Sequence, residues 1–276
     1  MRLAFIGGGF MGEAMISAVL RGNVAAPDAL SVGEVSEERR RHLQSRYGVG
    51  VSADNAEAAR GADIVVLAVK PQEFAAVARG LRDHLGSEQT VASIMAGVRI
   101  DAIREALGHR ALVRVMPNTA ALVGEAMSLW TATEEVDTDR REQVRRILAA
   151  MGKEMYVTDE KYLDIATAVS GSGPGFVFLL LEAFIDGAVH IGLRREAATE
   201  TVLQTVLGSV RMAQETGKHP AELRNMVTSP GGTTAEGLRV LEEAGVRRQW
   251  SMPLSPPTSE PWNWEDRLSS TSSFAS

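Results

Sequence analysis

Cysteine is absent from the 276 residues, which excludes a disulfide-stabilised scaffold, a thiolate metal site and a catalytic thiol. Long apolar runs are also absent, because no segment reaches the ~18 consecutive apolar residues of a membrane-spanning helix. We therefore expect no membrane association and no bound metal. Lysine is scarce among the 29 basic residues, so a catalytic lysine has few possible positions. The lysines are Lys70, Lys153, Lys161 and Lys218.

The net charge of −6 argues against nucleic acid as a partner, since phosphate backbones are bound by basic surfaces. The hydrophobic fraction of 45% is sufficient for a packed core and excludes wholesale disorder. The length fits one large domain or two ordinary ones. This composition predicts a soluble, cytoplasmic protein, and a lack of cysteine is what a reducing compartment permits.

Up to about residue 155, short apolar runs rich in β-branched residues alternate with longer amphipathic stretches such as Ser36–Tyr47 and Gln72–Leu85. The short runs are typical of strands in a parallel sheet that is covered on both faces. Strands that alternate with helices predict a doubly wound α/β domain, which we place at residues 1–157. The expected strands include Leu3–Ile6, Ala29–Val32, Ile64–Val69, Thr90–Met95 and Ala111–Met116.

From residue 158 to 247 the pattern indicates helices only, and we expect a second, all-α domain there. The central helix, Gly175–Ile191, is apolar around most of its circumference, and such a helix must be buried on all sides. A domain this small has little material of its own to surround it, so we expect a partner subunit in an intertwined oligomer. The flanking helices are expected at Tyr162–Val169 and Arg195–Glu215, with breaks at Ser170–Pro174 and Gly192–Leu193.

The last segment, residues 248–276, differs from the rest, because it holds three of the four tryptophans and four of the ten prolines without any regular period. It is open to interpretation as a disordered linker, a binding segment or unrelated sequence such as a reading-frame change would leave. The abrupt change at Arg247–Arg248 favours the last of these, and we expect the segment to be disordered.

A G-x-G-x-x-G pattern follows the first expected strand and opens the next helix, in the stretch Ile6–Gly12. In this position Gly7 permits a tight turn, Gly9 lets the backbone approach a pyrophosphate, and Gly12 allows the helix to pack closely on the strand. The helix N-terminus then offers free N–H groups to the phosphates. The context favours dinucleotide binding over a merely flexible turn.

Glu34 lies at the end of the second strand, where an acidic side chain accepts hydrogen bonds from the ribose hydroxyls and disfavours a 2′-phosphate. This position favours NADH. Against it, the following arginines, 39–41, would be able to neutralise a phosphate, although a solvated helix face is the simpler interpretation. The choice of nicotinamide cofactor stays open at this point.

Lys70, in Ala68–Gln72, ends a buried strand, and ligands of open α/β sheets collect at the carboxyl ends of strands. Lys70 is therefore either a ligand of cofactor or substrate or a solvated lysine. The loops Ser93–Gly97 and Arg114–Thr119 are expected to border the same crevice.

In the helical region, Ser229–Thr234 offers backbone N–H groups and hydroxyls that suit a carboxylate, although a helix–helix loop with a threonine N-cap is the simpler interpretation.

These motifs together resemble the pyrroline-5-carboxylate reductase family, over a span from Met1 to about Val246. The most specific stretches are Ala-Val-Ser-Gly-Ser-Gly-Pro at 168–174 and Met-Val-Thr-Ser-Pro-Gly-Gly-Thr-Thr at 226–234. The resemblance implies an α/β Rossmann-type N-terminal domain and an all-α C-terminal domain that interlocks in a homodimer, with dimers that assemble into larger rings. Members continue past Gly245–Arg247 into a further amphipathic helix, whereas here the atypical tail follows.

The resemblance also implies reduction of 1-pyrroline-5-carboxylate to L-proline with NADPH or NADH, and it assigns roles to particular residues. Thr234 would lie near the imine nitrogen as the catalytic residue. Cofactor binding is assigned to Ile6, Gly7, Gly8, Gly9, Phe10, Met11, Gly12, Glu34, Asn55, Ala68, Val69, Lys70, Pro71, Ala96 and Gly97. Substrate binding is assigned to Asn118, Ser229, Gly231, Gly232, Thr233 and Thr234.

Two other functions remain as alternatives. A β-hydroxyacid dehydrogenase shares the domain order, but it needs a group that moves the alcohol proton, typically a lysine on the helix after a Ser-Gly turn. The helix Gly175–Leu193 contains no lysine. A non-catalytic NAD(P)-binding sensor would bind the cofactor without oxidising it when an imine acid is added.

Overall fold

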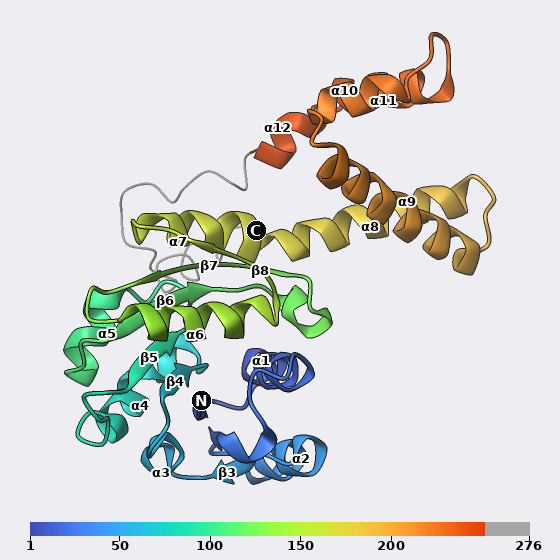
Figure 1. Ribbon diagram of the computed structural model, residues 1–276. Helices are drawn as coiled ribbons and strands as arrows, with labels where there is room; N and C mark the ends of the chain where they lie inside the picture. Colours follow the sequence, from blue (N-terminus) through green and yellow to red (C-terminus); the bar gives the residue numbers. More distant parts are fainter. Residues whose placement is uncertain (252–276) are drawn as a thin grey trace, which may run out of the picture. The chain divides into compact units, whose positions relative to one another are not determined.

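The computed structural model describes residues 1–251, which divide into two compact units. The first unit is Met1–Pro174, and the described part of the second runs from residue 175 to 251 (Figure 1). The sequence places the domain boundary at 157/158, whereas these units divide after Pro174, and the boundary at 157/158 stays a prediction. Of the atypical tail, residues 248–251 form the end of a helix, which differs from the expected disorder, and residues 252–276 lie outside the described part.

The first unit is built on an eight-stranded sheet with the order β3-β2-β1-β4-β5-β6-β7-β8. Strands β1 to β6 are parallel, and β1 and β4 are neighbours at the point where the strand order reverses. All four residues of β1, β4 and β5 are buried, as the near-continuous apolar runs predict. The strands are β1 Leu3–Ile6, β2 Leu30–Gly33, β3 Gly50–Ser52, β4 Ile64–Leu67, β5 Thr90–Ser93, β6 Leu112–Met116, β7 Ala126–Ala132 and β8 Gly152–Tyr156.

Helices cover both faces of this sheet (Figure 1). One apolar core joins α1, α2 and α6 to the sheet, and a second joins α3, α4 and α5 to the opposite face. This is the doubly wound arrangement that the sequence predicts. The helices are α1 Phe10–Arg21, α2 Glu37–Tyr47, α3 Asn55–Ala59, α4 Phe74–Leu81, α5 Ile100–Leu107, α6 Thr138–Ala149 and α7 Lys161–Ala166.

The far end of the sheet departs from the expected parallel pattern, because β7 runs antiparallel to β6. The connection, residues 117–125, is shorter than the dozen or more residues that a crossover between parallel strands needs. It contains a 3₁₀ turn, Thr119–Val123, which ends at Gly124 with φ of 77°. Helix α6 then provides the crossover that makes β8 parallel to β7.

Arg114, on β6, is the largest fully buried side chain of the first unit, and only 2% of it is exposed. Its guanidinium donates to Glu160 Oε1 and Asp164 Oδ1, both at 2.7 Å. Glu160 Oε1 also accepts the backbone N–H of Ile100 at 2.8 Å. This partly buried network joins β6 to α7 and to the start of α5.

The predicted break at Ser170–Pro174 is wrong, because the chain stays helical there. A π-helical turn, Thr167–Gly171, links α7 to α8, and the amide of Ser172 donates to the Thr167 carbonyl oxygen five residues back at 2.9 Å. Pro174 is tolerated because it lies in the first turn of α8, where backbone N–H groups are unpaired in any case. Single π turns within helices often occur at functional sites.

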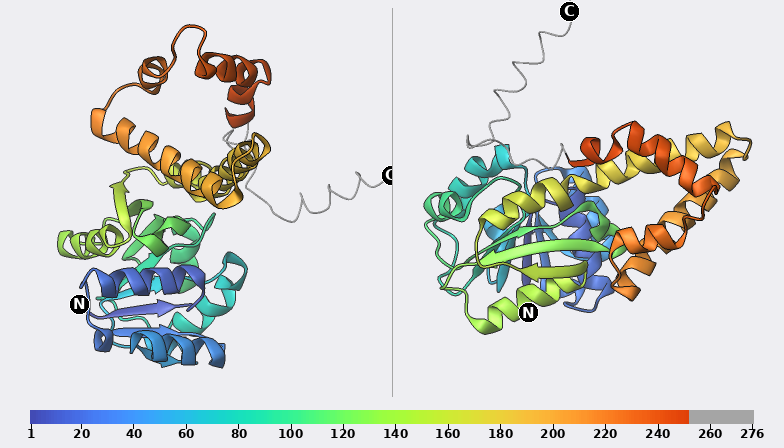
Figure 2. Two further views of the ribbon diagram at one scale, coloured as in Figure 1. Left: turned by 90° about the vertical axis from the view of Figure 1, so that its right-hand side faces the viewer. Right: turned by 90° about the horizontal axis from the view of Figure 1, so that it is seen from above.

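The described part of the second unit consists of helices and loops (Figure 2). None of the residues of α8 is buried within this chain, and Phe178 and Leu179 are 65% and 66% exposed. The stretch Lys161–His190 is long and apolar enough to cross a membrane, by length and composition only. The helices are α8 Gly173–His190, α9 Arg195–Thr216, α10 Pro220–Met226, α11 Thr233–Glu243 and α12 Val246–Ser251.

Candidate functional site

The glycine loop lies between β1 and α1, at the carboxyl edge of the sheet. Gly7 has φ of 101°, its amide donates to the Gly33 carbonyl at 2.8 Å, and a Cβ there would lie 2.7 Å from the Ala68 carbonyl oxygen. A Cβ at Gly12 would collide with the Gly7 carbonyl oxygen. Both positions therefore require glycine, one for the turn and the other for helix–strand packing.

Gly9 is the N-cap of α1, and its surroundings fit a bound pyrophosphate. A Cβ built on Gly9 meets no atom within 4 Å, so the space in front of the loop is open. Gly9 carries no side chain that caps α1, and the first backbone N–H groups of a helix have no partner within it. Free N–H groups and the positive end of the helix dipole make this loop suited to a dinucleotide.

Glu34 follows β2 and holds the glycine loop from one side. Its carboxylate accepts the backbone N–H of Gly8 and that of Ser36, each at 2.9 Å. A fixed negative charge beside the loop is the arrangement that accepts ribose hydroxyls. The Glu34 carboxylate therefore lies beside the loop, and its contact with the ribose stays a prediction.

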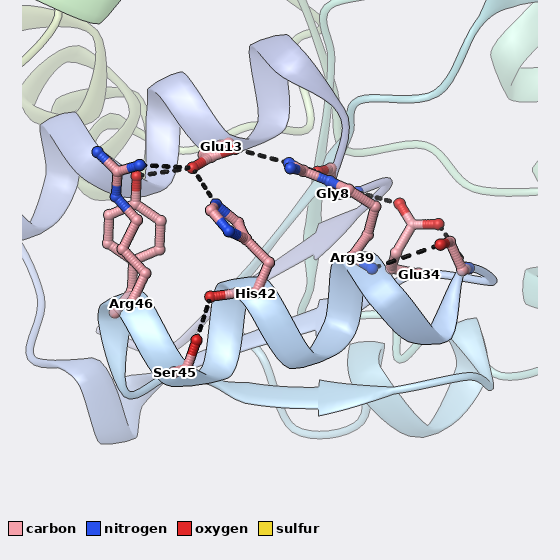
Figure 3. Close-up of polar contacts among 9 residues, drawn as sticks. Gly8, Glu13, Glu34, Arg39, His42, Ser45 and Arg46 are labelled. Atoms are coloured by element: carbon pink, nitrogen blue, oxygen red, sulfur yellow. Dashed lines mark hydrogen bonds and ion pairs between the residues drawn. The ribbon is translucent and has the colours of Figure 1, made fainter.

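A cluster of charged side chains connects α2 to α1 behind the loop (Figure 3). Arg39 donates to the Gly8 carbonyl oxygen through Nε at 3.2 Å and Nη2 at 2.6 Å, and Nη2 also pairs with Glu13 Oε2 at 2.6 Å. Tyr47 Oη and His42 Nε2 each lie 2.9 Å from Glu13 Oε1. Arg39 is thus held by Gly8 and Glu13, which differs from the solvated helix face that was the simpler interpretation of the sequence.

The electrostatics of this cluster centre on Glu13. Burial by itself would raise the pKa of Glu13, but hydrogen bonds from Arg39, His42 and Tyr47 lower it from 4.5 to about 2. Burial and the hydrogen bond to Glu13 raise the pKa of Tyr47. Glu13 is therefore a carboxylate, and Tyr47 a neutral donor to it, at any physiological pH.

The other predicted cofactor residues lie at the same edge of the sheet. Ala68–Pro71 follows β4, where Ala68 donates its amide to the Ile6 carbonyl at 2.8 Å and Lys70 is exposed. Ala96 and Gly97 follow β5 and are exposed, with φ of 75° at Gly97 and open space around it. Asn55 begins α3 and packs against Gly33. The structure thus brings the cofactor set together around the ends of β1 to β5.

Asn118 follows β6 and contacts the π turn. Its Nδ2 donates to Ser170 Oγ at 3.2 Å, and the Ser170 hydroxyl donates to the Met127 carbonyl at 3.1 Å. Ser170 is part of the 168–174 signature, but the sequence analysis gave it no role of its own. Ser170 lies in the π turn, and a π turn has no hydropathy signal. Only the 168–174 signature could therefore have indicated that Ser170 has a role.

Ser229–Thr234 lies in the second unit, between α10 and α11. Gly231 has φ of 69°, and Gly232 is the N-cap of α11 with no side-chain hydrogen bond to the helix. The expected threonine N-cap is therefore not present, because Thr233 and Thr234 are already the first two helical residues. Their backbone N–H groups are unpaired within the helix, which leaves them available to an anion.

Two residues important to the glycine loop were missed in the sequence: Glu13, and Arg39 in its role as a partner of Gly8. Their contact is 26 residues apart along the chain and depends on α1 packing against α2. A charged residue in the first turn of a helix is common, so nothing in the local sequence distinguishes Glu13.

Comparison with family models matches both parts of the chain. Residues 2–97 match the model described as "NADP oxidoreductase coenzyme F420-dependent". Residues 160–252 match the model described as "Pyrroline-5-carboxylate reductase dimerisation".

Individual relatives cover most of the chain. A pyrroline-5-carboxylate reductase of Methanosarcina acetivorans is 42% identical over 89% of this chain and 91% of its own length, and that of Escherichia coli is 38% identical over the same shares. Among solved structures, a pyrroline carboxylate reductase of Plasmodium falciparum with NADP bound has a TM-score of 0.84 and 32% identity, and covers 92% of this chain and 94% of its own. The pyrroline-5-carboxylate reductase of Coxiella burnetii has the same TM-score and coverage at 36% identity.

Proposed function

The chain belongs to the pyrroline-5-carboxylate reductase family, and from this premise we propose how its residues carry out the reaction. It is an NAD(P)H-dependent oxidoreductase, and its function is reduction of the cyclic imine of 1-pyrroline-5-carboxylate to L-proline. The observation that carries the cofactor part of this conclusion is the glycine loop after β1, with its turn at Gly7, close packing at Gly12 and open space at Gly9. The imine substrate follows from the family.

The loop would hold the pyrophosphate through its free N–H groups, and Glu34 with Asn55 would meet the adenosine ribose. Ala68–Pro71 and Ala96–Gly97 would line the nicotinamide side. When bound, the reduced nicotinamide supplies the hydride that the imine carbon receives. The protein's own contribution is then to position and orient the two reactants.

The loop Ser229–Thr234 would hold the substrate carboxylate through backbone N–H groups. The Thr234 hydroxyl, or a water that it orients, would accept a hydrogen bond from the N–H of the protonated imine. A protonated imine is already electrophilic, so a strong general acid is not required. This agrees with the sequence, which has no lysine between Lys161 and Lys218. Asn118, in the first unit, stays a predicted substrate-binding residue.

We further propose a homodimer in which a second copy covers the apolar surface of α8, in place of a membrane. Support comes from the dimerisation model, which matches residues 160–252, and from the absence of any buried residue in α8 of the single chain. Assembly of dimers into larger rings and a cytoplasmic location belong to the same proposal.

The test is oxidation of NADH and of NADPH by the purified full-length protein, with and without 1-pyrroline-5-carboxylate. We expect oxidation that depends on the substrate, and the ratio of the two rates reports the effect of Glu34. A protein that binds the cofactor but does not oxidise it when 1-pyrroline-5-carboxylate is added would instead be a non-catalytic NAD(P)-binding sensor.

Thr234→Ala tests the assignment of the hydroxyl. We expect kcat to fall about 10- to 100-fold, the effect of one lost hydrogen bond to a charged group, with recovery in Thr234→Ser. Thr228→Ala is the matched control, because the Thr228 hydroxyl, just after α10, donates to the carbonyl of Arg224 in α10. Full turnover and an unchanged KM for the substrate in Thr234→Ala would remove Thr234 from the mechanism.

A further inference from the structure

Both polar groups of the Gly8 backbone are held by charged side chains that come from the segment after β2. The N–H donates to Glu34 Oε2 at 2.9 Å, and the carbonyl accepts from Arg39 Nη2 at 2.6 Å and Nε at 3.2 Å (Figure 3). Gly8 is itself buried, whereas Gly9 beside it is exposed. The middle of the glycine loop is therefore fixed from behind by one carboxylate and one guanidinium.

The geometry of the peptide bond connects Arg39 to the open side of the loop. The Gly8 carbonyl and the Gly9 N–H belong to one planar trans peptide unit, in which the C=O and N–H bonds point in opposite directions. A carbonyl drawn toward Arg39 therefore turns the Gly9 N–H away from α2. Glycine has no Cβ to restrict rotation of this peptide, so a side-chain anchor has much to contribute.

We propose that Arg39 is a positioning residue for cofactor binding, which fixes the Gly8–Gly9 peptide so that the Gly9 N–H faces the pyrophosphate. Arg39 thus acts on the part of the cofactor that NADH and NADPH share. The inference rests on the proposed function only in that a dinucleotide occupies the loop.

Glu13 makes this anchor rigid. Its Oε2 holds the Arg39 guanidinium at 2.6 Å, while its Oε1 is held by His42 and Tyr47. The Glu13 side chain is 16% exposed and that of Arg39 34% exposed, so the pair lies partly out of solvent. Anchored in this way, Arg39 has a defined orientation before any cofactor arrives.

The test is the affinity of Arg39→Met for NADH and for NADPH, measured by fluorescence titration of the full-length protein without substrate. We expect both dissociation constants to rise by about 10-fold or more, as for loss of a hydrogen bond to a charged group, with their ratio unchanged within about twofold. At saturating cofactor, kcat with 1-pyrroline-5-carboxylate should stay near that of the wild type. If Arg39 only stabilised the fold, the substitution would not weaken cofactor binding, and so raise the KM for the cofactor, while leaving kcat unchanged.

Two further variants complete the design. Arg145→Met removes the same charge from an exposed ion pair with Glu142 on α6, and it should change neither affinity. Glu13→Gln keeps the shape of the anchor but removes its charge, and it should weaken both cofactors in the same direction by a smaller factor. If Arg39→Met fails to fold, Glu13→Gln carries the test.

Three results would overturn the inference. Weaker binding of NADPH alone would make Arg39 a ligand of the 2′-phosphate. Unchanged affinity for both cofactors in Arg39→Met would show that the loop does not need the anchor. An equal loss of affinity in Arg145→Met would show that only the net charge of the protein matters. Failure of the proposed function is distinguishable, because it would appear as a wild-type protein that binds cofactor but does not oxidise it with the imine.

Discussion

The two units differ in where their apolar side chains are buried. In the first unit, β1, β4 and β5 are buried entirely by helices of the same chain. In the second, α8 is apolar around most of its circumference, yet none of its residues is buried in the described part of the chain. A helix that is apolar all round requires cover on all sides, and a large exposed apolar surface marks an interface. The first unit therefore completes its own core, whereas in the proposed dimer a second copy would cover the apolar surface of α8.

The first prediction, which has the greatest effect, concerns the apolar surface of α8. Leu179→Asp places a charge in the proposed interface, and burial of an unpaired charge costs several kcal/mol. We expect the dissociation constant of the oligomer to rise by about 100-fold or more, measured by light scattering after size exclusion over a range of concentrations. Cofactor affinity should change by no more than about twofold, because the glycine loop lies within the first unit.

The control is Ala76→Asp, which adds the same charge to an exposed position of α4 in the first unit. It should leave the oligomer intact. A Leu179→Asp protein with unchanged mass in solution would contradict the assignment of α8 to the subunit interface.

The second prediction concerns the self-contained core of the first unit. Arg114→Met leaves the carboxylate of Glu160, which is 16% exposed, without its main partner. We expect the free energy of unfolding to fall by about 3 kcal/mol, because removing one partner of a buried ion pair leaves an uncompensated charge. Urea unfolding followed by circular dichroism measures the change.

Arg145→Met gives the comparison, since this exposed pair should contribute less than about 1 kcal/mol. Equal losses in the two variants would mean that burial of Arg114 has no energetic consequence.

The smallest effect is a pH dependence that originates at Glu13. Since its pKa in the folded protein is about 2 instead of 4.5, its contribution to stability is present above pH 4.5 and is lost as the pH falls toward 2. Glu13→Gln should therefore be less stable than the wild type at pH 7, and the difference should shrink between pH 4.5 and 3. The effect is moderated because Arg39 is one-third exposed to solvent.

Urea midpoints at pH 7, 4.5 and 3 test this prediction. Glu37→Gln removes an exposed carboxylate of α2 and should show little difference at any of these values. A Glu13→Gln difference that stays constant with pH would contradict a lowered pKa.

Most of the first unit could be predicted because its patterns are local. Each buried strand is an apolar run, and the glycine spacing in Ile6–Gly12 places the turn, the helix start and the cofactor edge together. The antiparallel direction of β7 was not predicted, because it depends on the short connection after β6. The π turn at Thr167–Gly171 was read as a break, because Gly and Pro stop most helices and a single wider turn has no separate signal.

The alternation of strands and helices, the position of the glycine loop and the family follow from the amino-acid sequence alone. They depend on hydropathy period and on residues close together in the chain. Three contacts are visible only in the folded chain: Glu13 with Arg39, Arg114 of β6 with α7, and Asn118 with Ser170. Each of these pairs joins elements far apart in sequence. Such long-range contacts form where packing brings helices, strands and loops together, and packing is a property of the whole fold.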